Sequence, residues 1–93
     1  MRCRVIDTIE HREAWTRHHP GLTGRGDGVL AVVDPADLAD PHGIAERLVV
    51  VHRPDGTRIE LRVDLAEAPA GVLGLFFRGM GSVDVPRCSV IEW

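Results

Sequence analysis

Four residue types are missing from this chain of 93 residues, which contains no Lys, Asn, Gln or Tyr. Without Lys, the chain can build neither a Schiff-base lysine nor a Walker A phosphate-binding loop, so both kinds of site are excluded. No apolar run is long enough to span a bilayer, and residues 1–7 lack the apolar core of a secretory signal. We therefore expect a cytoplasmic protein with no membrane partner. The abundance of Arg, Ala, Gly and Val is typical of a GC-rich genome, which suggests a bacterial origin.

The net charge of −3 is unevenly distributed along the chain. Residues 1–25 hold five arginines against three acids, whereas residues 26–60 hold three arginines against seven acids. A protein that follows a phosphate backbone is normally basic overall, because each neutralised phosphate needs a cation. The distribution favours a protein partner, or at most a nucleic-acid end held at one place by the first quarter of the chain. It argues against DNA as a partner.

Short β-branched segments separated by Gly and Pro turns predict an all-β protein. The clearest is a hairpin over residues 47–64, in which Pro54-Asp55-Gly56 forms the turn. After this turn, apolar and charged residues alternate as they do in a strand with one buried face. Further strands are predicted at residues 2–10, 29–33, 71–77 and 87–91, with a loop at residues 66–70.

One helical turn is predicted at residues 34–40, because Asp34 is a good N-cap and Pro35 suits the first helical position. Pro41 would end it. Six short strands in a chain of this length favour a single domain, residues 1–93, folded as a small closed antiparallel β-barrel. Closure would leave no sheet edge exposed.

Two segments support a more specific fold. Residues 22–26 read Leu-Thr-Gly-Arg-Gly and precede the valine-rich strand at residues 29–33. Near the C-terminus, a strand containing Gly74 ends in Arg78-Gly79, and a polar turn, Asp84-Val85 and Arg87 lead to a final apolar strand. In order and spacing these segments resemble the second domain of translational GTPases of the elongation factor Tu kind, a small antiparallel β-barrel. Here that domain would stand alone, without the GTPase domain.

The resemblance implies a ligand and two site residues. Family members bind the 3′ aminoacyl end of tRNA partly through this domain, which implies Arg25 and Asp64 as pocket residues. An Arg fork suits a phosphate or a terminal ribose, and a carboxylate accepts hydrogen bonds from ribose hydroxyls. The alternative is structural: the glycines would serve the bend, and Arg25 would pair with Asp27 or another acid.

The chain departs from the family pattern in three places. Cys88 stands where the family has a glycine after the final arginine, and residues 34–46 form a longer, acidic connection. The segment at about residues 10–21 is predicted to be an inserted loop. It carries Trp15 with Arg12 and Arg17, residue types that are enriched at binding hot spots and that also stack on bases. The alternative is that Trp15 covers one end of the barrel.

No cofactor, metal or catalytic residue is expected. The spacing of His11, His18 and His19 matches no common zinc pattern. The few hydroxyl and thiol groups lie in no recognisable nucleophile motif, so we predict that the protein is not an enzyme. Cys3 and Cys88 are expected to be reduced, with a disulfide between the first and last strands as the alternative.

The leading hypothesis is a non-catalytic binding module that contacts the tRNA acceptor end or a ribosomal component. Its ligand-binding residues would be Arg12, Trp15, Arg17, Arg25 and Asp64. The alternative is a protein–protein interaction module, either an adaptor or a neutralising, immunity-type partner. That module would use the segment around Trp15 and the acidic residues 34–46.

Overall fold

A computed structural model shows a mostly antiparallel β-sheet protein, and it describes residues 1–15, 22, 24–38, 43–67 and 73–93. Among these residues, seven strands form one sheet in the order β4-β3-β7-β1-β2-β6-β5. The described residues also include two 3₁₀ turns, η1 (Glu13–Trp15) and η3 (Pro35–Asp37). The strands are β1 (Arg2–His11), β2 (Gly28–Val33), β3 (Leu48–His52), β4 (Arg58–Arg62), β5 (Asp64–Glu67), β6 (Leu73–Arg78) and β7 (Val90–Glu92).

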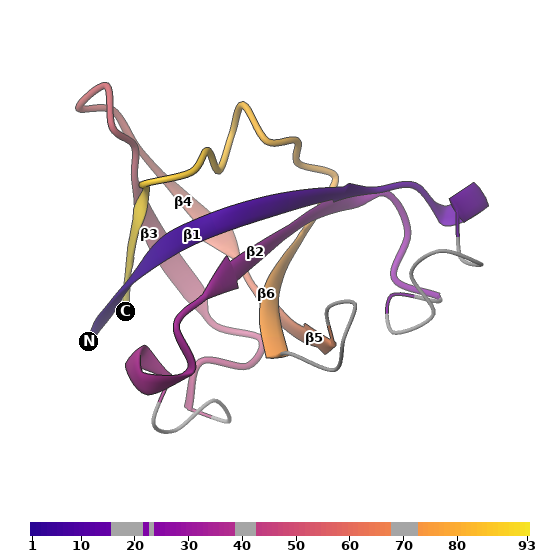
Figure 1. Cartoon of the computed structure of the whole chain (residues 1–93), viewed down its shortest axis with the longest axis horizontal. Helices are drawn as coiled ribbons and strands as arrows, with labels where there is room; N and C mark the ends of the chain where they lie inside the picture. Colours follow the sequence, from indigo (N-terminus) through magenta and orange to yellow (C-terminus); the bar gives the residue numbers. More distant parts are fainter. Residues whose placement is uncertain (16–21, 23, 39–42, 68–72) are drawn as a thin grey trace.

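The long strand β1 joins the two halves of the sheet (Figure 1). Its first residues pair with β7, and its residues from Val5 onward pair with β2, with a shift of register between Val5 and Asp7. The two ends of the chain lie side by side. The terminal ammonium of Met1 donates to the Trp93 carbonyl at 2.8 Å, and the Trp93 N–H donates back to the Met1 carbonyl at 3.0 Å.

The main core lies between the two halves of the sheet. It collects the inward side chains of both halves, and its largest members include Phe77, Leu75, Ile91 and Ile44. A second cluster covers the other face of the β1-β2-β6-β5 half and consists of Leu22, Leu30, Ala66 and Phe76, with Ile9 packed against it. Strands β2 and β6 therefore have buried side chains on both faces, and their sequences are almost continuously apolar.

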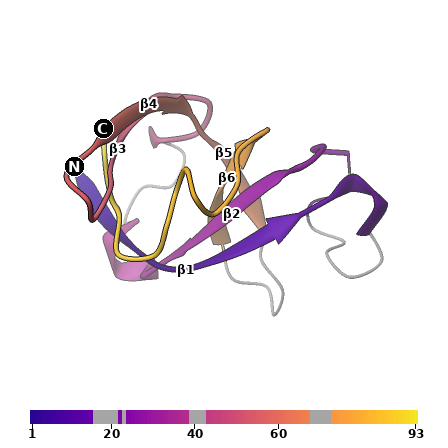
Figure 2. The same ribbon diagram turned by 90° about the horizontal axis from the view of Figure 1, so that it is seen from above.

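The expected closure of the barrel is wrong. Strands β4 and β5 are the two ends of the strand order, and within the described residues no hydrogen-bonded ladder joins them. The chain runs from β4 to β5 through Val63, whose N–H donates to the Arg47 carbonyl at 3.0 Å and whose carbonyl accepts from Glu46 N–H at 2.9 Å. Val63 is hydrogen-bonded to the residues that precede β3, whereas β5 pairs with β6. Strands β4 and β5 therefore diverge and do not pair with each other. Figure 2 shows the sheet curled but not closed.

The expected six strands also need correction. Residues 64–67 form β5, paired with β6 from Asp64–Phe76 to Glu67–Leu73, where the sequence had suggested a strand end followed by a loop. The last strand begins at Val90 instead of residue 87. Glu10 and His11, placed in the inserted loop, belong to β1 and pair with Val29 and Gly28.

Several local predictions are confirmed. Strands β3 and β4 form the hairpin, and Gly56 takes a positive φ of 90° in its turn. Asp34 caps η3, because its carboxylate accepts the Ala36 N–H at 2.9 Å and Pro35 opens the turn. Cys3, which is buried, and Cys88, which is exposed, are both free thiols. Among the helices described, none has the length and apolarity to cross a membrane.

Candidate functional site

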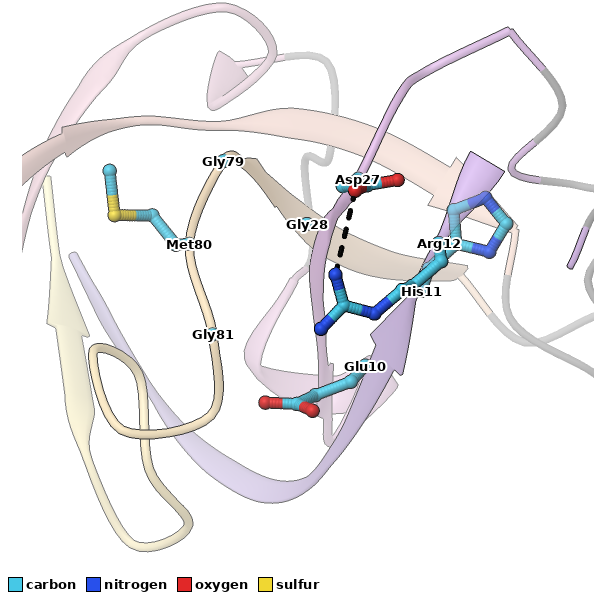
Figure 3. Close-up of a pocket in the computed structure, with 8 residues that line it drawn as sticks. All are labelled: Glu10, His11, Arg12, Asp27, Gly28, Gly79, Met80 and Gly81. Atoms are coloured by element: carbon cyan, nitrogen blue, oxygen red, sulfur yellow. Dashed lines mark ion pairs between the residues drawn. The ribbon is translucent and has the colours of Figure 1, made fainter. Parts of the chain in front are cut away.

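Three segments that are distant in sequence meet at the end of β1 and line a pocket of about 360 Å³. Glu10, His11 and Arg12 come from the end of β1, Asp27 and Gly28 from the start of β2, and Gly79 to Gly81 from the turn after β6 (Figure 3). The Gly79 N–H donates to the Asp27 carbonyl at 2.8 Å, so the second and third segments are tied to each other directly. The pocket therefore lies where residues 10–12, the first part of the predicted inserted loop, meet the two segments on which the resemblance to the elongation factor Tu domain rests.

Glu10 is held in place by the turn that follows β6. Its carboxylate accepts both the N–H and the hydroxyl of Ser82, each at 3.0 Å. These hydrogen bonds lower the pKa of Glu10, and the nearby charge of Arg12 contributes less. Glu10 is therefore a fixed anion with its remaining acceptor positions open to a ligand.

Arg12 and Asp27 add a second charged feature to the pocket. The guanidinium lies 3.7 Å from the Asp27 carboxylate, and both side chains are exposed. Figure 3 shows Arg12 reaching across the pocket mouth toward Asp27, on the same side as the Glu10 carboxylate. An exposed ion pair at this distance is weak, so a ligand could replace Arg12 or Asp27 as the other's partner at little cost in free energy. With two carboxylates and one guanidinium, the pocket favours groups that donate hydrogen bonds.

Gly28 and the His11 ring line the pocket, and both lie against Phe76. A Cβ at Gly28 would lie 2.5 Å from the Phe77 carbonyl oxygen and 2.6 Å from the Phe76 ring, so only glycine fits there. The buried His11 ring packs edge-on against Phe76, with centroids 6.4 Å apart and an interplanar angle of 70°. His11, which the sequence placed in the inserted loop, is therefore packed into the sheet and not exposed in a loop.

The Gly24-Arg25-Gly26 turn is held by Glu13, a residue whose role the sequence did not suggest. Both glycines have φ of +80°, and their N–H groups donate to the Glu13 carboxylate at 3.1 Å and 2.8 Å. The Glu13 N–H in turn donates to Asp27 at 2.8 Å. Gly24 and Gly26, which flank Arg25 and both have positive φ, direct their N–H groups toward one anion, the Glu13 carboxylate of the same protein. No local sequence signal links Glu13 to glycines more than ten residues away.

The structure does not gather the sequence-predicted site residues in one place. Arg12 lines the pocket at the end of β1, whereas Asp64 begins β5 and lines a second pocket of about 420 Å³ with Leu61, Arg62, Arg78 and Met80. Arg25 is half-buried, lines neither pocket, and within the described residues has no ion-pair partner, so the expected pair with Asp27 is not formed. Its N–H donates to the Leu22 carbonyl at 3.1 Å. Arg17 and the side chain of Trp15 lie outside the described residues.

Neither Cys3 nor Cys88 lines the pocket at the end of β1. Burial, and to a smaller extent the charge of Asp37, raises the pKa of Cys3 to about 11, so it is a neutral thiol at physiological pH. In the part of the chain that the structure describes, no three His, Cys, Asp or Glu side chains are grouped to hold a metal ion. The chain matches no protein-family model, no curated protein and no solved structure.

Proposed function

We propose that this protein is a non-catalytic binding module, similar in fold to the second domain of elongation factor Tu, and that it holds an RNA end such as the tRNA acceptor end or a ribosomal component. The observation that carries the proposal is the convergence of the three segments around Glu10 and Arg12 at one pocket.

The chemistry of the pocket suits the terminal nucleotide of an RNA. The Glu10 carboxylate is fixed by Ser82 and can accept hydrogen bonds from the two hydroxyls of a terminal ribose. Arg12 can leave its weak pair with Asp27 to meet the adjacent phosphate. The glycine backbone at Gly28, Gly79 and Gly81 allows a sugar to approach closely.

The test is binding of a fluorescent RNA hairpin with a single-stranded 3′ end, measured by anisotropy. Glu10→Gln keeps an acceptor for Ser82 but removes the charge, and Arg12→Ala removes the guanidinium; each should weaken binding about tenfold. Arg87→Ala is the matched control, because Arg87 is exposed and outside the pocket. Oxidising the terminal ribose with periodate should weaken binding of the wild-type protein by a similar factor. Equal affinities for intact and oxidised RNA would contradict the proposal.

A protein partner is the second candidate. Asp34, Asp37 and Glu46 are exposed carboxylates on the connection between β2 and β3, and such a surface suits a basic protein. Val83, with 83% of its surface exposed, stands next to Ser82 and offers an apolar contact beside the pocket. A pull-down divided into nuclease-treated and untreated halves separates the two functions. A defined protein that persists after nuclease treatment, with no RNA recovered from the untreated half, would replace the RNA proposal.

A further inference from the structure

The register of the β4-β3-β7-β1 half brings together arginines that are far apart in the sequence. Residues directly opposite each other in an antiparallel ladder project from the same face of the sheet. One row across the four strands is Arg58–His52–Val90–Arg4, and the next is Glu60–Val50–Glu92–Arg2. Arg62 and Leu48 form a further pair on this face. We call these ten residues the outer sheet face.

The outer sheet face is directed away from the core. The alternate residues of the same strands, Cys3, Val51 and Ile91 among them, are buried in the main core. In Figure 2 these strands form the curved side of the molecule that carries both chain ends, with β2, β5 and β6 on the other side. All four arginines of the face are exposed.

The charge of this face is opposite to that of the whole protein. Four arginines stand against two glutamates, a net of +2, in a chain whose total is −3. Glu92 is already engaged: it pairs with Arg2 at 2.9 Å and lies 3.4 Å from His52, and hydrogen bonds from these two groups lower its pKa. Among the described residues, Arg4, Arg58 and Arg62 have no ion-pair partner, so these three guanidinium groups are available to an anion.

The spacing of the three arginines fits an extended anion. Strands lie about 4.8 Å apart, so Arg4 and Arg58, three strands apart in one row, are separated by roughly 14 Å. Arg58 and Arg62 are four residues apart on β4, which corresponds to roughly 13 Å. A single small anion cannot bridge such distances, whereas a chain of phosphates can.

The composition of the face favours a nucleic-acid backbone over an acidic protein. Stable protein interfaces have a central, desolvated apolar or aromatic anchor. This face has no aromatic ring, and its three apolar residues, Leu48, Val50 and Val90, are flanked by arginines and glutamates on the neighbouring strands. Contacts to phosphates need cations alone and carry no sequence information.

We propose that the outer sheet face binds the phosphate backbone of RNA through Arg4, Arg58 and Arg62, without reading its sequence. This inference rests on the proposed function, since it places the body of the same RNA whose end would lie at the pocket. It also explains how a chain of negative net charge can bind RNA, because arginines outnumber glutamates on the outer sheet face, although Asp37 lies beside Arg2 and Arg4 at its border.

The test compares two double variants with equal loss of charge. Arg4→Ala/Arg58→Ala removes two arginines from the outer sheet face, and Arg47→Ala/Arg87→Ala removes two exposed arginines that lie neither on this face nor in either pocket. RNA affinity is measured between about 50 and about 200 mM salt, over which each phosphate contact contributes roughly 0.7–0.9 to the slope of log affinity against log salt. The first variant should lower the slope by about 1.5 and weaken binding at least tenfold at low salt, and the second should leave both unchanged. Circular dichroism and thermal unfolding confirm that both variants are folded.

Each other outcome overturns the inference in a distinguishable way. If Glu10→Gln and Arg12→Ala weaken RNA binding but Arg4→Ala/Arg58→Ala does not, the pocket stands and the outer sheet face is not an RNA surface. If the wild-type protein binds no RNA, both proposals fail. If polyglutamate competes with RNA as well as polyuridylate does, the face belongs to an acidic protein partner instead.

Discussion

The half of the sheet formed by β1, β2, β6 and β5 has apolar residues on both faces, whereas the β4-β3-β7-β1 half has core on one face and charged residues on the other. In β2 nearly every side chain is buried, but in β4 burial alternates between Ile59 or Leu61 and the arginines and glutamate beside them. A strand that is covered on both faces leaves only its ends for a partner, and the pocket at the end of β1 lies at such ends. The half with one exposed face can therefore evolve a binding surface without disturbing the core, and that is where the outer sheet face lies.

The largest loss of stability is expected in the β1-β2-β6-β5 half, which has buried side chains on both faces. Phe76 is fully buried between Leu30, Ala66 and Leu22, and Phe76→Ala should destabilise the protein by about 3–5 kcal/mol, because it leaves a cavity that the rigid sheet cannot fill. Arg58→Ala, in the half with an exposed face, should change the free energy of unfolding by less than about 0.5 kcal/mol. Urea unfolding of both variants measures the difference. Similar losses of free energy of unfolding in the two variants would mean that the burial of the two halves differs less than their burial patterns indicate.

A smaller effect is expected where β2 and β6 approach each other most closely. At Gly28 an added Cβ would meet the Phe77 carbonyl and the Phe76 ring, so Gly28→Ala should cost about 1–3 kcal/mol through overpacking. Gly81→Ala is the control in the same pocket, since its Cβ would meet only side-chain oxygens, Glu10 Oε1 at 3.2 Å and Asp84 Oδ2 at 3.9 Å, and no backbone atom. If both substitutions cost the same in thermal unfolding, the close approach at Gly28 is not what requires the glycine.

The all-β class and the hairpin were predictable because they depend on local signals. The alternation of Ile59, Leu61 and Val63 and the turn at Gly56 specify the hairpin without reference to any other part of the chain. Closure of the barrel was not predictable in the same way. It depends on where, near Val63, the chain stops pairing with β3 and begins to pair with β6, a choice between distant partners that no local pattern encodes.

The candidate site was predictable in part. Arg12 was identified from its residue type and does line the pocket, but Glu10 was missed because its side chain is positioned by Ser82, more than seventy residues away. The basic face was missed for a similar reason. Counting charges along the chain separated Arg2 and Arg4 from Arg58 and Arg62, whereas the register of β1, β7, β3 and β4 places them on one surface.

The smallest expected effect concerns the segment that connects the two halves, from β6 to β7. Cys88 has φ of 68°, a left-handed conformation that favours glycine, and its N–H donates to the Val5 carbonyl at 2.9 Å beside the irregularity in β1. An L-residue in this region costs about 1–2 kcal/mol, and glycine gives back about 0.5–1 kcal/mol as extra entropy of the unfolded chain. Cys88→Gly should therefore stabilise the protein by about 0.5–1 kcal/mol.

Cys88→Ser separates this backbone effect from the loss of the thiol, because it removes the sulfur and keeps the side chain at positive φ. Thermal unfolding should show a raised midpoint for Cys88→Gly and an unchanged one for Cys88→Ser. A lowered midpoint for the glycine variant would mean that the Cys88 side chain contributes contacts worth more than the strain. A raised midpoint would mean that the positive φ at residue 88 strains any side chain placed there, so that the backbone of this turn favours glycine.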